Sequence, residues 1–348
     1  MSSSRLRTRR FGSAAAAAAA AGVLLAAAVP AHAPAAERAG ATGSAAAFPK
    51  LVRSKLIHYR AHNGARRSAI VLLPRWYSRR DNPALPLIIS PHGRGATARS
   101  NAAAWGALPA AGLFAVINPS GQGRRLWRHS WGCHGQVTDL ARMPRILARA
   151  LPWVRIDKKR IYAFGSSMGG QETLLLAARY PYLLAGAAAF DAVTDFRLQY
   201  RNFPLLSCST RCRRERTAPV GVQLQALARE EVGGPPRVYP GAYARRSPIA
   251  YARRLAGSCV PLQLWWSLYD RIVVRPSGQS GRLYERIVAL NPAAPVEAYI
   301  GFWRHSMEMN ARGQLPLALA RFDLLPRVLA PVGMIAVPPP KDACRRGG

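Results

Sequence analysis

Short runs of apolar residues alternate along this chain with longer segments in which apolar residues recur at helical spacing. Seven such runs predict β-strands, at residues 68–74, 85–91, 113–119, 160–166, 185–191, 261–267 and 296–301. Four intervening segments predict helices, at residues 138–151, 169–180, 247–255 and 278–290. Several of the runs are apolar at every position, which is typical of strands that are covered on both faces. From about residue 50 onward, the pattern therefore predicts an α/β fold, a mostly parallel twisted sheet with helices on both faces.

The N-terminal segment lacks this alternation. It begins with basic residues, continues through an alanine-rich apolar run at residues 14–29 and ends in small residues. This three-part pattern predicts a secretory signal peptide at residues 1–35, within which "TRRF" resembles a twin-arginine export signal. Residues 36–49 have the composition of a linker. We therefore expect a secreted or cell-surface protein with no membrane-spanning helix.

Residues 192–246 interrupt the alternation with two cysteines, a "GGPPR" break and clustered arginines. An insertion of this length after a strand can form a cap over a site or a disulfide-pinned surface loop, and the pattern does not decide between them. We place the main domain at residues 50–335, with this insertion inside it, and a tail at residues 336–348.

Export would permit disulfide bonds in this chain. The sequence has five cysteines, which are Cys133, Cys208, Cys212, Cys259 and Cys344. Because the number is odd, one thiol is left over, and the sequence does not choose among the pairings. The cysteine spacing gives no zinc signature, and the closeness of Cys133 to His129 and His134 is better explained by loop structure. We expect no bound metal.

Basic residues far outnumber acidic ones, with 50 Lys+Arg against 16 Asp+Glu and a formal net charge of +34. The arginines recur through every segment of the chain, whereas a nucleic-acid-binding protein concentrates its charge in a stripe or tail. We therefore expect no specific nucleic-acid site. Such a surface should still associate weakly with anionic cell-wall polymers, in a way that depends on salt.

The candidate chemistry centres on "IYAFGSSMGGQET" at residues 161–173, which joins a predicted strand to a predicted helix through a G-x-S-x-G turn. Gly165 and Gly169 avoid the clashes that side chains would cause in such a turn, and Ser167 is the central residue between them. Ser166 falls on the strand side and is expected to support the turn. The helix that follows directs its N-terminal amides at the serine, so we predict Ser167 as a catalytic nucleophile.

A serine nucleophile needs a base and an orienting acid, and in this architecture they follow in the order Ser, Asp, His after later strands. Asp270 follows the predicted strand at 261–267, and His305 follows the one at 296–301. His305 is the only histidine after Ser167. Asp191 and Asp195 follow the preceding strand and are rivals for the acid, although Asp270 fits the order better.

An oxyanion hole and a substrate-binding mouth are the remaining parts of such a site. "PHGRG" follows an early strand, so we predict the backbone amides of Arg94 and Met168 as oxyanion donors and His92 as a brace for the loop. Around residues 121–132 the chain is rich in Trp and Arg. We predict that three of these residues line the mouth, although packing and solvation explain them equally well: Arg124, Trp127 and Trp131.

The segments "GSSMGG", "PHGRG" and "SPIAYARRLAGSCVPLQLWWSLYDRIVV", followed by "WRH", resemble the α/β-hydrolase fold. More narrowly, they resemble the catalytic domain of the prolyl oligopeptidase (S9) family and related secreted esterases, without the β-propeller. The resemblance covers about residues 50 to 330, and on it Ser167, Asp270 and His305 match the nucleophile, acid and base.

The resemblance implies an exported serine hydrolase that cleaves a peptide or ester bond by acyl transfer and uses no cofactor. An S9-like peptidase is slightly favoured, and a carboxylesterase acting on polyester or acylated polysaccharide is the alternative. A hypothesis of another class is a non-catalytic, cationic cell-surface binding protein on a hydrolase scaffold. The intact order of the three residues disfavours it.

Overall fold

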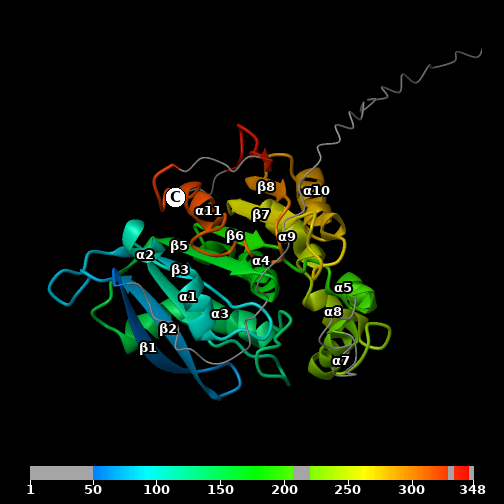
Figure 1. Cartoon of the computed structure of the whole chain (residues 1–348), viewed down its shortest axis with the longest axis horizontal. Helices are drawn as coiled ribbons and strands as arrows, with labels where there is room; N and C mark the ends of the chain where they lie inside the picture. Colours follow the sequence, from blue (N-terminus) through cyan, green and yellow to red (C-terminus); the bar gives the residue numbers. More distant parts are fainter. Residues whose placement is uncertain (1–49, 207–219, 328–332, 345–348) are drawn as a thin grey trace, which may run out of the picture. The chain divides into compact units, whose positions relative to one another are not determined.

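The computed structural model describes residues 50–206, 220–327 and 333–344. The predicted signal peptide, the predicted linker and the pair Cys208 and Cys212 lie outside the described residues. Within them, the strands form one sheet in the order β1-β2-β4-β3-β5-β6-β7-β8-β9 (Figure 1). Their bounds are Val52–Arg60 (β1), Arg66–Pro74 (β2), Leu85–Ile89 (β3), Ala115–Pro119 (β4), Ile156–Ser166 (β5), Gly186–Phe190 (β6), Leu262–Ser267 (β7), Val296–Gly301 (β8) and Ile335–Val337 (β9).

The sheet is mostly parallel, as predicted. Strands β4, β3, β5, β6, β7 and β8 pair in parallel, whereas β1, β2 and β9 join by antiparallel pairing. All seven predicted strands are present, with ends that differ by a few residues. Two strands were not predicted. Strand β1 is an edge strand whose polar positions break the apolar pattern, and β9 is only three residues long.

Helices occupy the crossovers between the parallel strands. Their bounds are Ala98–Ala104 (α1), Leu108–Ala111 (α2), His134–Ala150 (α3), Met168–Arg179 (α4), Phe196–Asn202 (α5), Val220–Val232 (α7), Pro240–Arg245 (α8), Ala252–Gly257 (α9), Ser280–Leu290 (α10) and Leu315–Ala320 (α11). Helix α4 ends just before Pro181, as the sequence predicts. The predicted helix at 247–255 is a 3₁₀ turn at Pro248–Tyr251 followed by α9. Among the described residues, no helix is long and apolar enough to cross a membrane.

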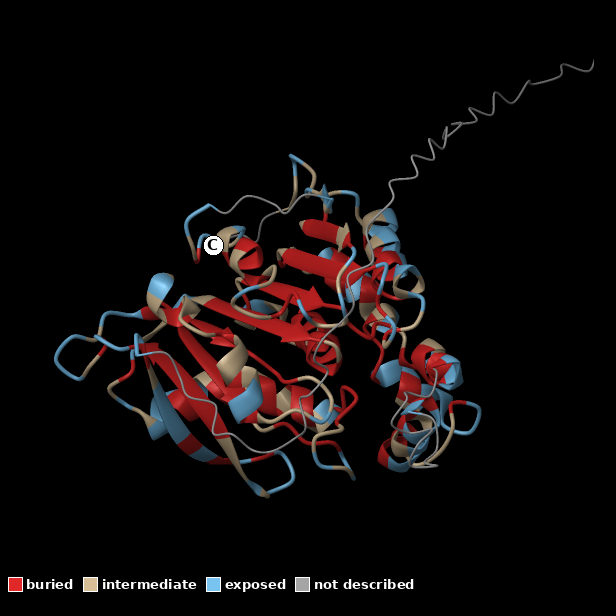
Figure 2. Cartoon of the chain, viewed as in Figure 1, coloured by how far each residue is buried: buried red, intermediate tan, exposed pale blue. Residues whose placement is uncertain are grey.

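Each face of the sheet buries its own apolar core, because successive strand residues point to opposite faces. On one face, Val71 and Leu73 of β2 pack in a cluster with apolar residues of α3, α4, α9 and α10. On the other face, Ile70 and Leu72 pack in a cluster with residues of α1 and α11. Figure 2 shows the central strands buried and the exposed residues gathered at the periphery. Packing on both faces fixes the positions of the strand ends that carry the candidate site.

The insertion predicted at residues 192–246 is helical where the structure describes it. Helices α5, α7 and α8 lie together beside the sheet (Figure 1) and share a third apolar cluster that includes Phe196, Phe203 and Tyr243. The carboxylate of Glu231 in α7 is fully buried and accepts hydrogen bonds from successive backbone amides at Arg124, Arg125 and Leu126, at 2.6, 2.8 and 2.9 Å. The described part is therefore a packed helical layer that is fastened to the loop at residues 121–133.

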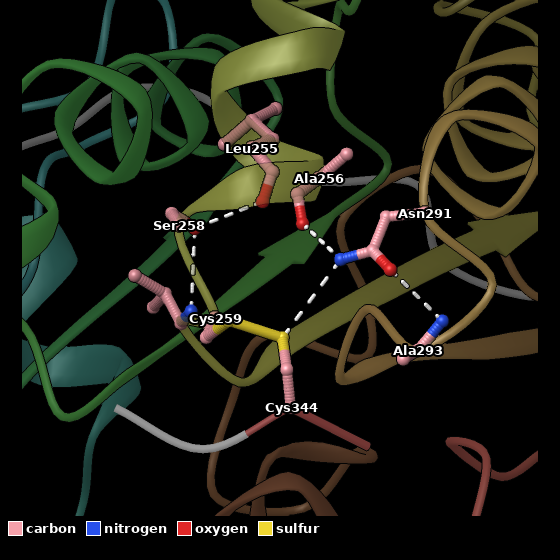
Figure 3. Close-up of a disulfide and its surroundings, with 8 residues drawn as sticks. Leu255, Ala256, Ser258, Cys259, Asn291, Ala293 and Cys344 are labelled. Carbon is pink, nitrogen blue, oxygen red and sulfur yellow. Dashed lines mark hydrogen bonds between the residues drawn. A yellow bond between two sulfur atoms is a disulfide. The ribbon is translucent and has the colours of Figure 1, made fainter. Parts of the chain in front are cut away.

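The described part of the C-terminal segment, which the sequence analysis treats as a tail, is attached to the sheet. Strand β9 pairs with β8, and Cys344 forms a disulfide with Cys259, which lies just before β7 (Figure 3). The Cys344 backbone amide also donates to the Ala293 carbonyl at 2.7 Å. The side chain of Asn291 donates to the Ala256 carbonyl at 2.8 Å beside this disulfide. The described C-terminal residues are therefore attached at two points, by the pairing of β9 with β8 and by the disulfide between Cys344 and Cys259.

Candidate active site

Ser167 occupies the sharp turn between β5 and α4. Its backbone has φ 57° and ψ −121°, a region that residues with a side chain rarely adopt. The Ser167 amide donates to the Phe190 carbonyl at 2.8 Å, and the Ser167 carbonyl accepts from the Gln171 amide at 3.0 Å. These two bonds hold the strained turn from both sides. A serine in such a conformation is raised out of the strand and helix, as the G-x-S-x-G motif predicts.

The motif glycines are required by close backbone contacts. A Cβ atom at Gly165 would lie 2.4 Å from the Gly169 carbonyl oxygen, and one at Gly169 would lie 2.3 Å from the carbonyl oxygen of Pro91. Neither approach is possible for a residue with a side chain unless the backbone moves. The contact to Pro91 also brings the loop after β3, which carries "HGRG", against the start of α4.

His305 and Asp270 form a hydrogen-bonded pair at the ends of β8 and β7. The His305 Nδ1 and Asp270 Oδ2 atoms are 2.8 Å apart, and the carboxylate side chain is completely buried. The other carboxylate oxygen accepts from the backbone amides of Ile272 at 2.7 Å and Val273 at 3.0 Å. Because the carboxylate is fixed on both oxygens, the imidazole is oriented through Nδ1, and its Nε2 is the nitrogen left to exchange a proton.

A cavity of about 360 Å³ brings the predicted residues together. Ser167, His305 and Arg94 all line it, and Asp270 lies behind His305 through the hydrogen bond just described. The remaining lining residues are Gly93, Ala96, Ser100, Asn101, Ala104, Ser166, Ile272, Ser306 and Met309. The lining therefore contains no acidic side chain.

The predicted oxyanion donors lie on the two segments that meet at this cavity. A Cβ atom at Gly93 would lie 3.7 Å from the Ser166 carbonyl oxygen and 3.9 Å from the Ser167 Cβ, so the Arg94 segment rests against the turn. Within the described residues, neither the Arg94 amide nor the Met168 amide has a hydrogen-bond partner. Both amides are thus available to a ligand.

His92 has the geometry of a structural brace. It is buried, its Nδ1 lies 2.8 Å from the Gly93 carbonyl oxygen, and its Nε2 accepts from the Gly121 amide at 3.0 Å. This arrangement places the proton on Nδ1 of a neutral ring. Burial also lowers the pKa of His92, which keeps the ring neutral. The loop after β3 is thereby tied to the loop after β4.

The two rival acids have other partners. Asp195 caps α5 by accepting from the Leu198 amide at 2.9 Å. Asp191, which is buried at the end of β6, supports the histidine loop: its Oδ2 accepts from the Ser306 amide at 2.9 Å and from the Trp303 indole at 3.1 Å. Its Oδ1 accepts from the Ser267 amide of β7 at 2.9 Å.

A group of buried acids surrounds His305. One ligating atom each of Asp191, Asp270 and His305 lies within 4.8 Å of the others. Burial and the nearby charge of Asp270 raise the pKa of Asp191. Burial and the charge of Asp191 raise the pKa of Glu308 well above its usual range. Among these acids, Asp270 is the one that is hydrogen-bonded to the imidazole.

Two further residues at the site were missed by the sequence analysis. Ser306 directly follows His305, has φ 61° and shares a hydrogen bond with the Ser166 hydroxyl. This bond links the turn that carries Ser167 to the loop that carries His305. Glu308 lies three residues after His305, and only its appearance in "WRHSMEM" could have suggested it.

The predicted mouth residues do not line this cavity. Trp131 is buried in the third apolar cluster, where it stacks on Phe196 with ring centroids 5.1 Å apart. Trp127 is exposed and borders a different hollow beside β1 and β2, and the exposed Arg124 contributes its backbone amide to Glu231. The prediction is therefore corrected, because the loop turns its large side chains toward the helical insertion and toward solvent.

No protein-family model matches this chain, and no curated protein matches it by sequence. Solved structures do resemble it. The acylaminoacyl peptidase of Pyrococcus horikoshii has a TM-score of 0.57 at 17% identity, over 81% of this chain and 43% of that chain. A puromycin-hydrolyzing peptidase of Mycobacterium tuberculosis has a TM-score of 0.52 at 18% identity, over 75% of this chain and 36% of that chain.

An S-formylglutathione hydrolase from Agrobacterium tumefaciens is also similar. Its TM-score is 0.52 at 14% identity, over 75% of this chain and 91% of that chain. This chain spans less than half the length of the two peptidases and nearly the whole length of this hydrolase. Together with the sheet order, these likenesses show that the chain has the α/β-hydrolase fold that its motifs resemble.

Proposed function

We propose that this protein is a serine hydrolase that cleaves a peptide or ester bond by acyl transfer. Ser167 is the nucleophile, His305 the general base and acid, and Asp270 the residue that orients the imidazole. The observation that carries this proposal is the 2.8 Å contact between His305 and Asp270 at the wall of the cavity that Ser167 also lines. A strained serine, a base and a fixed acid are the parts that such catalysis requires.

In the proposed reaction, the Ser167 Oγ attacks the substrate carbonyl while His305 Nε2 takes the hydroxyl proton. The carbonyl oxygen becomes negatively charged and accepts hydrogen bonds from the Met168 and Arg94 amides. Each such donor contributes about 2.7–4 kcal/mol to the stability of the transition state. Collapse of this intermediate breaks the scissile bond, and His305 returns the proton to the leaving group. Water, deprotonated by His305, then releases the acyl group from Ser167.

The substrate class rests on the motifs. An S9-like peptidase is the first candidate, because "GSSMGG" and "PHGRG" resemble that family and two peptidases are among the structural neighbours. A carboxylesterase acting on polyester or acylated polysaccharide is the second. This alternative is favoured by the S-formylglutathione hydrolase, because the matched region covers 91% of that chain and leaves little of it outside the shared fold. Both activities use the same residues.

The site of action that we propose is outside the cytoplasm. The N-terminal pattern supports export, and the Cys259–Cys344 disulfide is compatible with an oxidising compartment. The net charge of +34 supports weak association with anionic cell-wall polymers. Cell fractionation tests the location, and sedimentation with purified cell walls at low and high salt tests the association.

Labelling with a fluorophosphonate probe tests the catalytic proposal. We expect Ser167→Ala to abolish labelling and to lower turnover by about 10⁶-fold, whereas Ser166→Ala retains a measurable rate. The opposite pattern would assign the nucleophile to Ser166. If the folded wild type is neither labelled nor active on p-nitrophenyl esters and p-nitroanilides, the non-catalytic binding protein becomes the better account. Comparison of kcat/KM on esters and anilides with matched acyl groups separates esterase from peptidase.

A further inference from the structure

Arg94 presents an unpaired cation to the candidate active site. Arg94 is one of the residues that line the same cavity as Ser167 and His305, and it is about half-buried. Among the described residues, its guanidinium makes no hydrogen bond and no ion pair. All other polar residues of the lining apart from His305 are neutral, and they are Ser100, Asn101, Ser166, Ser167 and Ser306. A guanidinium has five N–H donors, and within the described residues those of Arg94 have no acceptor.

The acids near the cavity are occupied by other groups. Asp270 is used by His305 and two backbone amides, and Asp191 is used by two backbone amides and an indole. Glu231 accepts three backbone amides and also pairs with Arg246 at 3.0 Å. Glu308, three residues after His305, is the exception, because it is buried and neither of its carboxylate oxygens has a hydrogen-bond partner. Among the described residues, however, neither Glu308 nor any other carboxylate forms an ion pair with Arg94.

The electrostatic surroundings of Arg94 support this description. Burial lowers its pKa, and no neighbouring acid acts in the opposite direction. Burial lowers the pKa of His129, and the charges of Arg94 and Arg128 lower it further. The loop of Arg94 is fastened to this basic neighbour by a 3.0 Å bond from the Gly95 amide to the Arg128 carbonyl. A desolvated cation without a partner is costly unless a ligand supplies the anion.

We propose that the Arg94 guanidinium binds a carboxylate of the substrate, so that the enzyme acts on esters or amides that carry a carboxylate close to the scissile carbonyl. The inference rests on the proposed function and specifies its substrate. The same residue supplies the candidate oxyanion amide, which places the guanidinium within one side-chain length of the reacting carbonyl. Arginine suits this role because its planar fork can hold both oxygens of a carboxylate.

Two arms of one experiment locate the carboxylate. The acyl arm compares p-nitrophenyl butyrate with mono-p-nitrophenyl succinate, which replaces the terminal methyl by a carboxylate. The leaving-group arm compares 4-nitrophenyl acetate with 3-carboxy-4-nitrophenyl acetate. In each arm the readout is the ratio of kcat/KM for the charged substrate to that for the neutral one, after subtraction of the uncatalysed rate. A ratio is used because any change in the Arg94 loop also affects the oxyanion amide.

The variants are Arg94→Gln and a matched control, Arg304→Gln. Arg304 is exposed and adjacent to His305, but it does not line the cavity, so its loss reports only the general positive field. Measurements at 0.5 M salt suppress attraction by the surface charge, since the screening length there is only about 4 Å. We expect Arg94→Gln to lower the charged-to-neutral ratio about tenfold to a hundredfold in one arm, and Arg304→Gln to leave it within about twofold.

The outcomes separate the two proposals. Loss of preference in the acyl arm places the carboxylate on the acyl side, and loss in the other arm places it on the leaving group. If wild type turns over the neutral esters but neither ratio changes in Arg94→Gln, the inference is wrong and the proposed function stands. If equal changes occur in both variants, the preference comes from surface charge and the inference is also wrong. If no ester is hydrolysed and the probe does not label Ser167, the proposed function itself fails.

Discussion

The assignment of the acid can be tested by exchanging each of two buried carboxyls for an amide. In Asp270→Asn, the amide oxygen can keep both backbone bonds from Ile272 and Val273, which leaves the NH₂ group facing His305 Nδ1. Because that nitrogen must then accept a hydrogen bond, the ring proton moves to Nε2. A ring protonated at Nε2 cannot take the Ser167 proton. The fold is retained, but the tautomer is wrong for catalysis.

The expected cost to turnover follows from that tautomer. We expect kcat to fall by about 10⁴-fold near neutral pH, with little change in thermal stability. The measurement is kcat on a p-nitrophenyl ester across the pH range, together with a thermal melt. Partial recovery at high pH is expected, where solvent base can assist.

Asp191→Asn should behave in the reverse way. Its two oxygens accept three N–H groups, so an amide nitrogen must face at least one of them, the best case being the Ser267 amide. An orphaned buried donor costs about 1–3 kcal/mol, which corresponds to roughly 2–10 °C in melting temperature. Activity should fall by less than in Asp270→Asn, because Asp191 supports the loop of His305 through the Ser306 amide and does not touch the ring.

The two variants together decide between the acids. A catalytic loss of about 10⁴-fold in Asp191→Asn, with Asp270→Asn close to wild type, would show that the acid was assigned to the wrong strand. Equal losses of activity at equal losses of stability would show only a shared structural role. If Asp270 is the acid, Asp270→Asn loses mainly activity, whereas Asp191→Asn loses mainly stability.

Three further changes test other parts of the structure. Gly169→Ala should destabilise the protein by about 3 kcal/mol and lower kcat, because its Cβ would lie 2.3 Å from the Pro91 carbonyl oxygen. A urea titration measures the stability and an ester assay measures kcat. Unchanged stability and activity would contradict the close contact. Cys344→Ser opens a link across 85 residues to Cys259 and should lower the free energy of unfolding by at most about 4.5 kcal/mol. Titration of the unfolded, oxidised wild type with a thiol reagent checks the bond directly, and reactive Cys259 and Cys344 thiols would exclude it. Burial raises the pKa of Glu172 from 4.5 to about 7, so the folded state keeps a proton that the unfolded chain loses, and stability falls as pH rises between those values. Relative to Glu172→Gln, the fall should be on the order of 3 kcal/mol in urea unfolding at pH 4.5 and 7.5, and parallel pH curves would refute it.

The turn that carries Ser167 was predictable because its determinants are local. A buried strand, two glycines four residues apart and an apolar helix all fall within residues 161–180, and each contributes a known restriction on the backbone. The same holds for the parallel strands, whose apolar runs are continuous. Strand β1 was missed because an edge strand needs no continuous apolar run, and its polar positions resemble a loop.

The support of the histidine loop was not predictable, because it depends on which strands are neighbours. Asp191 reaches Ser306 and Ser267 only because β6, β7 and β8 are adjacent in the sheet. Sequence order marked Asp191 as a possible acid but could not show which atoms its oxygens meet. Trp131 shows the same limit, since a tryptophan in a glycine-rich loop serves equally well in a mouth or in a core, and here it is 3% exposed.

The distribution of acids explains why an anionic substrate suits this protein. Acidic residues number only 16 in the chain, and seven of them are buried among the described residues: Asp139, Glu172, Asp191, Glu231, Asp270, Glu297 and Glu308. Three of them near the site, Asp191, Glu231 and Asp270, accept backbone amides. Arg94 is consequently left without a counter-ion in a chain whose surface already attracts anions. A substrate carboxylate would supply the counter-ion that Arg94 lacks among the described residues. The positive surface field would also speed the diffusion of such a substrate to the cavity.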